Sequence, residues 1–89
     1  MELSIIIVNY HQSHLLKASL ESVYLTVKNI QFEVIVVDNS SKDEGLNPIL
    51  DQFPETKLIG NSTNVGFACA NNQGAKMAKG DFLLLINPD

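Results

Sequence analysis

The apolar residues of this chain are arranged in runs and in one clear helical repeat. Two runs, at 3–10 and 32–40, are rich in β-branched residues and end in short polar groups, which is typical of strands buried in a parallel sheet. Between them the sequence predicts an amphipathic helix over about 13–28. Its apolar positions recur at helical spacing: Leu16, Leu20, Val23 and Val27. Strand, helix and strand form a crossover unit, so we expect parallel strands with a right-handed connection.

A second crossover begins after the run at 32–40. Ser41 and Glu44 fit a capping box, which predicts a short helix that ends near Gln52. A short strand is expected next, over 56–60.

The third crossover consists of a predicted helix over 64–80, closed by Gly80, and a strand over 81–86. The small residues of this helix are expected to let it pack close to the sheet: Ala68, Ala70, Gly74, Ala75 and Ala78. The layout is βαβαβαβ without a linker, which predicts one α/β domain over 1–89. The apolar run Leu83 to Ile86 is typical of a strand buried on both faces.

Composition narrows the class of protein. A chain of 89 residues with 45% hydrophobic and 18% charged residues is a small folded domain. With a formal charge of −4 and six Lys and Arg residues scattered along the chain, the sequence lacks the clustered basic residues that bind nucleic acid. Cys69 is the only cysteine, so we expect a reducing compartment and a small buried side chain in the last helix. No apolar run is long enough for a signal peptide or a membrane span, which favours a cytoplasmic protein, at most peripheral to the inner face of the membrane.

Candidate chemistry lies where the strands end, because open parallel sheets bind ligands beyond the carboxyl ends of their strands. Local turn and capping chemistry is sufficient to explain Asn39, Ser40 and Ser41. Asp38 follows a buried strand directly, where a carboxylate accepts hydrogen bonds from a nucleotide base or ribose. A dinucleotide fold is excluded, because both G-x-G-x-x-G and the Walker sequence are missing. Asp89 supplies a hard oxygen ligand for Mg²⁺ or Mn²⁺, although such a residue alone is also typical of a turn.

Four stretches, in this order and at these spacings, resemble the N-terminal half of the family 2 glycosyltransferases, with the rhamnosyltransferase-like branch as the nearest match. They are SIIIVNYH at 4–11, VIVVDNSSKDEG at 34–45, LIGNSTNVGFACANNQGAKMAKGD at 58–81 and LLLINPD at 83–89. The resemblance implies the GT-A fold, a three-layer, Rossmann-like arrangement around a four-stranded parallel sheet of order 3-2-1-4. It also implies that this chain is a truncated, donor-binding part whose acceptor half is absent.

The resemblance assigns most of the site to nucleotide binding. By position, the residues that contact the nucleotide are Val8, Asn9, Tyr10, Asp38, Gly66, Asn71 and Asn87. Asn87 to Asp89 match the D-x-D motif of the family, with Asp89 as the ligand of a divalent metal and of the diphosphate. Asn87 departs from that motif, since an amide supplies no second negative charge, and metal dependence stays open.

The function implied is transfer of sugar from a UDP- or dTDP-sugar donor to a polysaccharide or lipid-linked acceptor. No catalytic residue is expected within these residues, and the chain alone is expected to be inactive. An exposed last strand is expected to favour a homodimer. The alternative is a non-catalytic module that binds nucleotide or another protein. A phosphoacceptor receiver domain is disfavoured, because Asn9 and Tyr10 stand where its paired acids belong.

Overall fold

The computed structural model describes residues 1–40 and 45–87. Within these ranges the strands are β1 (Leu3–Asn9), β2 (Phe32–Asp38), β3 (Lys57–Gly60) and β4 (Phe82–Ile86). The helices are α1 (Ser13–Thr26), α2 (Leu46–Gln52) and α3 (Phe67–Met77). None of these helices is long and apolar enough to cross a lipid bilayer. The predicted capping box of Ser41 and Glu44 lies outside the described residues.

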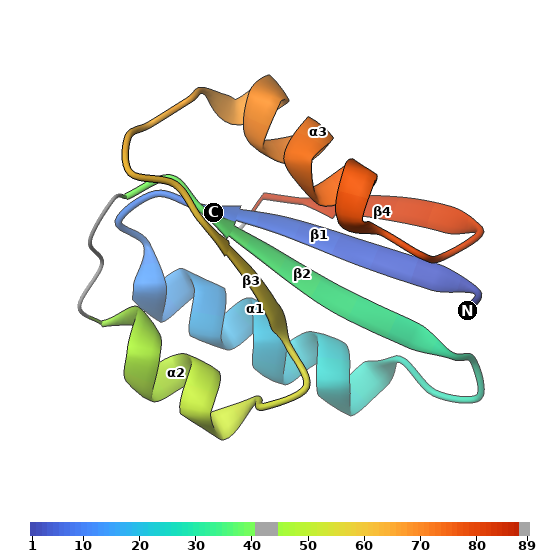
Figure 1. Ribbon diagram of the computed structural model, residues 1–89. Helices are drawn as coiled ribbons and strands as arrows, with labels where there is room; N and C mark the ends of the chain where they lie inside the picture. Colours follow the sequence, from blue (N-terminus) through green and yellow to red (C-terminus); the bar gives the residue numbers. More distant parts are fainter. Residues whose placement is uncertain (41–44, 88–89) are drawn as a thin grey trace.

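The strands form one parallel sheet of order β3-β2-β1-β4, as predicted. Helices α1 and α2 cover one face and α3 covers the other (Figure 1). Alternate side chains of β1 and β2 therefore enter two apolar layers. The layer under α1 and α2 includes Ile5, Ile7, Val34, Val36, Leu16 and Leu20. The layer under α3 includes Ile6, Val8, Ile35, Val37 and Ala70. Burial on both faces explains why these strands are continuous apolar runs.

Helix α3 is shorter than the sequence predicts. It begins at Phe67 because Gly66 has a φ of +89°, which is outside the helical region, and it ends before Ala78, whose backbone is extended. The predicted role of Gly80 as the helix terminator is therefore wrong. A Cβ on Gly80 would lie 2.5 Å from the backbone nitrogen of Ser4, so this glycine permits a close approach of two backbones.

The face of α3 that packs on the sheet consists of Ala70, Asn71 and Gly74. A Cβ on Gly74 would lie 2.6 Å from Cγ2 of Ile6, so Gly74 lets this helix lie close to the sheet as predicted. Ala70 is buried beside it, whereas Ala68 is exposed and the expectation that it packs on the sheet is wrong. Cys69 lies outside this face and is exposed, so the expectation of a buried thiol is wrong.

Strand β4 is exposed, as expected for the last strand of this chain, although its apolar run is typical of a strand buried on both faces. Phe82 is 74% exposed, and Leu83, Leu84 and Leu85 are 46–52% exposed. The two apolar layers are built mainly on β1 and β2, and of β4 only Ile86 packs against the layer under α1 and α2. Among the described residues no strand pairs with its outer edge.

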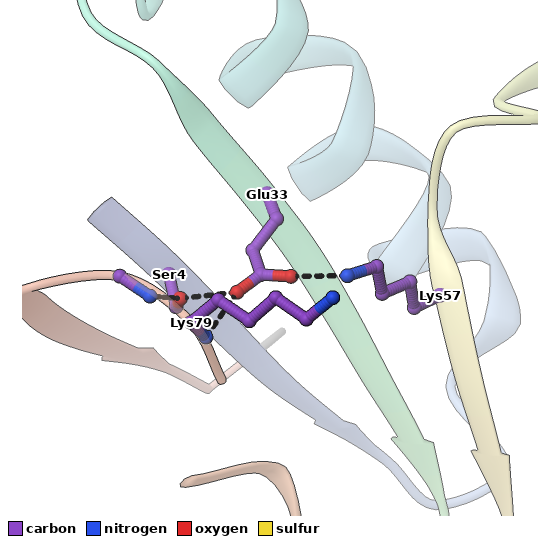
Figure 2. A network of polar contacts seen from close by, with 5 residues as sticks. Ser4, Glu33, Lys57 and Lys79 are labelled. Atoms are coloured by element: carbon purple, nitrogen blue, oxygen red, sulfur yellow. Dashed lines mark hydrogen bonds and ion pairs between the residues drawn. The ribbon is translucent and has the colours of Figure 1, made fainter. Parts of the chain in front are cut away.

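A buried carboxylate joins the elements at the amino-terminal end of the sheet (Figure 2). Glu33 accepts hydrogen bonds of 2.6 Å from the Ser4 hydroxyl, from the backbone N–H of Lys79 and from the Lys57 ammonium. Ser4 Oγ in turn accepts the Gly80 N–H at 2.8 Å. Burial alone would raise the pKa of Glu33, but these donors and the charge of Lys57 outweigh it and lower the pKa to about 2. This Glu33 network connects β1, β2 and β3 to the segment between α3 and β4.

Candidate functional site

The carboxyl ends of the parallel strands meet at one edge of the sheet, which we call the carboxyl edge. Asn9 lies opposite Asp38, and Asp38 lies opposite Gly60 on β3. The start of α3 reaches the same edge (Figure 1). The candidate residues predicted from the sequence lie at these strand ends, and the structure brings those of β1, β2 and α3 to this edge.

Asp38 is held rigidly at the carboxyl edge. Its Oδ1 accepts hydrogen bonds from Asn9 Nδ2 at 3.2 Å and from the backbone N–H of Ser40 at 3.0 Å. Asp38 is 7% exposed, whereas Asn9 is fully buried. Asn9 therefore orients the carboxylate, and Val8, also buried, belongs to the apolar layer under α3.

Tyr10, in the loop after β1, is reached by solvent, unlike Val8 and Asn9 on the strand. This residue is 52% exposed. The loop that carries it is fixed at His11, whose backbone N–H donates to Ser40 Oγ at 2.7 Å. His11 has a φ of +52°, which costs a non-glycine residue roughly 1–2 kcal/mol. Its ring meets that of Tyr10 edge to face, with the centroids 4.7 Å apart. Ser40, for which turn chemistry was predicted, thus holds both the Asp38 carboxylate and this loop.

The start of α3 is shaped by Gly66. Its N–H donates to Asn64 Oδ1 at 2.9 Å, and its carbonyl accepts from Asn39 Nδ2 at 3.2 Å. A side chain would be strained at its positive φ, so glycine is required by the backbone.

A set of uncharged side chains, the amide network, connects β2, β3 and α3. Asn61 Nδ2 donates to Asn39 Oδ1 at 2.9 Å and to Gln73 Oε1 at 2.8 Å. Gln73 Nε2 donates back to Asn61 Oδ1 at 3.0 Å. Asn39 completes the network through the Gly66 carbonyl. Asn61 and Gln73 were not predicted to have a role; the signal in the sequence is an amide directly after β3 and another on the helix that follows.

Asn71 is buried on the sheet side of α3. Its Nδ2 donates to the Phe67 carbonyl at 3.2 Å, whereas its buried Oδ1 has no hydrogen-bond partner among the described residues. An unsatisfied buried acceptor costs about 1–3 kcal/mol. Its place near the start of α3 makes it a candidate to accept a hydrogen bond from a ligand.

The candidate metal ligands lie after β4. Ile7 pairs with Ile86, so Asn87 follows at the carboxyl edge and is exposed, while Asp89 lies outside the described residues. No group of three His, Cys, Asp or Glu residues in 1–40 and 45–87 is arranged to hold a metal ion. Carboxylate and amide oxygens are both ligand types that a hard cation such as Mg²⁺ accepts.

A shallow groove of about 310 Å³ lies between α1 and β4, on the face of the sheet that α1 and α2 cover. Its lining residues are Leu15, Ala18, Ser19, Ser22, Val23 and Ile86. It contains none of the candidate site residues, although Ile86 directly precedes Asn87.

Comparison with known sequences identifies the family. The sequence model of glycosyl transferase family 2 matches residues 4–89. The chain belongs to glycosyltransferase family 2. It is 40% identical over 87 residues to an uncharacterized glycosyltransferase of Haemophilus influenzae, covering 98% of this chain and 29% of that protein. This family 2 chain therefore spans less than a third of that relative's length.

Solved structures confirm the GT-A fold of this family 2 chain. The mannosyltransferase PcManGT of Pyrobaculum calidifontis, in complex with GDP-Man and Mn²⁺, matches with a TM-score of 0.84 and 21% identity, over 99% of this chain and 27% of that one. TarS 1–349 of S. aureus, in complex with UDP-GlcNAc, matches with a TM-score of 0.82 and 28% identity, over 100% and 27% of the two chains. The rhamnosyltransferase-like branch stays a prediction.

Proposed function

We propose that residues 1–89 form the donor-binding part of a glycosyltransferase that uses a UDP- or dTDP-sugar. The observation that carries this proposal is the carboxylate of Asp38, which hydrogen bonds from Asn9 and Ser40 hold in one orientation. Asn9 lies opposite Asp38 in the sheet, and Tyr10, whose ring is exposed, follows Asn9 in the chain. Uracil and thymine present an N–H donor that a carboxylate accepts, and an aromatic ring offers a surface for the base or ribose. Gly66, Asn71 and Asn87 complete the proposed nucleotide contacts.

The proposed donor site includes a divalent metal, Mg²⁺ or Mn²⁺, bound through Asp89 with help from Asn87. When bound, such an ion neutralises the charge that develops on a departing nucleoside diphosphate. PcManGT, solved with GDP-Man and Mn²⁺, supports this assignment by analogy of fold. The acceptor, a polysaccharide or lipid-linked saccharide, and the general base that activates it are assigned to the part of the relatives that this chain does not span.

Replacing Asp38 with asparagine tests the donor site. The amide keeps an oxygen for Asn9 and Ser40 but loses the negative charge, so the dissociation constant for UDP is expected to rise at least about tenfold, the usual effect of losing a charge-assisted hydrogen bond. Isothermal titration calorimetry measures it. Asp51→Asn, on the exposed surface of α2, is the matched control and should bind UDP within about twofold of the unmodified chain. Equal affinity of Asp38→Asn and the control would argue against a base-reading role.

We also propose that this chain self-associates through β4, with a second copy as the partner. An unpaired strand edge of five residues without a charged side chain readily recruits another strand. A two-fold axis would pair β4 with the same strand of the second copy in antiparallel fashion. The groove between α1 and β4 adds apolar surface beside that edge.

Leu84→Lys is expected to convert the dimer to a monomer without loss of helix signal, because Leu84 is 46% exposed in the single chain and can accept a charge there. Light scattering after gel filtration measures the mass, and circular dichroism measures the helix content. Leu25→Lys, on α1 and 71% exposed, is the control that should leave the mass unchanged. A monomer at high micromolar concentration for the unmodified chain would rule out the β4 dimer.

A further inference from the structure

The amide network attaches α3 to the sheet at two separate points. At the start of the helix, Asn39 Nδ2 donates to the carbonyl of Gly66. About two turns further along, Gln73 forms its reciprocal pair with Asn61. Two attachment points on one helix fix its rotation as well as its position, which one point cannot do.

The remaining contacts of α3 with the sheet do not define its orientation in the same way. They are made by small residues, notably Ala70 and Gly74, which allow a close approach but offer few interlocking side chains. Hydrogen bonds, in contrast, demand specific distances and angles. The amide network is therefore the directional part of the interface of α3 itself, whereas the Glu33 network holds the segment that follows the helix.

The same network reaches the candidate base-reading residue. Asn39 follows Asp38 in the chain, and the backbone N–H of Asn61 donates to the Asp38 carbonyl at 2.9 Å. Asp38 is thus connected through Asn39 to Gly66 and through Asn61 to Gln73, the two points at which α3 is attached to the sheet. A shift of α3 would change the distance between Asp38 and Gly66, two of the residues assigned to nucleotide binding.

We propose that Asn39, Asn61 and Gln73 are positioning residues of the donor site, which hold the start of α3 at the distance from Asp38 that the nucleotide requires. This proposal rests on the proposed function, because it assumes that the nucleotide binds at the carboxyl edge. The three residues act through Gly66 and Asp38 and need not touch the ligand. The side chains of the amide network are neutral, whereas the Glu33 network after α3 is built around an ionised carboxylate.

Gln73→Met tests the proposal, since it keeps the volume of the side chain and removes both bonds of the reciprocal pair. The dissociation constant for UDP in the presence of Mg²⁺ is expected to rise about tenfold, because the net effect resembles the loss of one or two neutral hydrogen bonds. In the nucleotide-free protein, the ¹H–¹⁵N signals of Gly66 and Phe67 are expected to move. A purely structural role would lower the unfolding midpoint and leave the affinity of the folded protein unchanged.

Asn61→Leu also removes the bond to Asn39 and is expected to have the larger effect, and combining it with Gln73→Met should add nothing, because both delete the same pair. Gln52→Met, at the exposed end of α2, is the matched control and should leave both the affinity and the Gly66 signal unchanged. Gln73→Ala removes the same bonds with a better helix former and replaces Gln73→Met if that variant is unstable.

The outcomes separate this proposal from the one on which it rests. Absence of UDP binding to the unmodified chain would overturn both the donor site and the positioning role. UDP binding that Gln73→Met and Asn61→Leu leave unchanged would overturn the positioning role alone. Weaker binding together with shifted Gly66 and Phe67 signals supports it.

Discussion

Glu33→Gln is expected to lower the free energy of unfolding at pH 7 by about 3 kcal/mol, the lower end of the range of about 3–5 kcal/mol that is usual when one partner of a buried ion pair is removed. The amide would still accept from Ser4 and Lys79, but its NH₂ group would face the ammonium of Lys57, donor against donor. Lys57 is partly exposed and can turn toward water, which limits the loss. Urea unfolding measures the change. Glu21→Gln, exposed on α1, should change the free energy by less than about 0.5 kcal/mol.

The effect of Glu33→Gln is also expected to depend on pH. The pKa of Glu33 falls from 4.5 to about 2 on folding, so its stabilisation is complete above pH 4.5 and is lost as the pH falls from 4.5 toward 2. The difference in unfolding free energy between the unmodified chain and Glu33→Gln should therefore shrink over that window. A difference that stays constant from pH 6 to pH 2.5 would contradict a low pKa for this carboxyl group.

Gly80→Ala is expected to destabilise the chain by about 2–4 kcal/mol, at the upper end of the usual cost of overpacking. The added Cβ would lie 2.5 Å from the nitrogen of Ser4 and 2.6 Å from the carbonyl carbon of Leu3. Both atoms belong to the backbone of β1, so they cannot move aside as a flexible side chain would. The Gly80 N–H that donates to Ser4 would be displaced at the same time, which loosens the Glu33 network.

Gly60→Ala is the matched control for Gly80→Ala. A Cβ at Gly60 would meet no atom within 4 Å, and its φ is not positive. This substitution is expected to be neutral or to stabilise the chain by up to about 1 kcal/mol through the unfolded state. Thermal unfolding of the two variants side by side gives the comparison, and similar midpoints for both would show that the approach of the segment after α3 to β1 is looser than described.

The sequence predicted the sheet well because its signal is local. Runs such as 32–40 can be read as buried strands without knowledge of their neighbours, and the crossover rule then makes them parallel. The ends of α3 were predicted less well, because a helix ends where the backbone leaves helical angles. Gly66 determines one end through its φ, whereas Gly80, which looked like a helix terminator, serves a contact with β1.

The sequence predicted which strand-end residues form the candidate site, but it did not predict the contacts that hold these residues in place. Asp38 could be identified because a carboxylate after an apolar run is unusual. Ser40, Asn61 and Gln73 looked like ordinary polar residues, since their roles depend on partners between 12 and 29 residues away in the chain. Glu33 was overlooked for the same reason, because its three donors come from separate elements that only the folded chain brings together.

The most direct test of the central claim is a titration of the ¹⁵N-labelled chain with UDP and with dTDP, followed by ¹H–¹⁵N correlation spectra. If the donor nucleotide binds at the carboxyl edge, the signals that move are those of residues 8–11, 38–40 and 64–72, whereas those of the Glu33 network at the opposite end of the sheet stay in place. Shifts confined to other residues, or no shifts at millimolar nucleotide, would contradict a donor site in this chain.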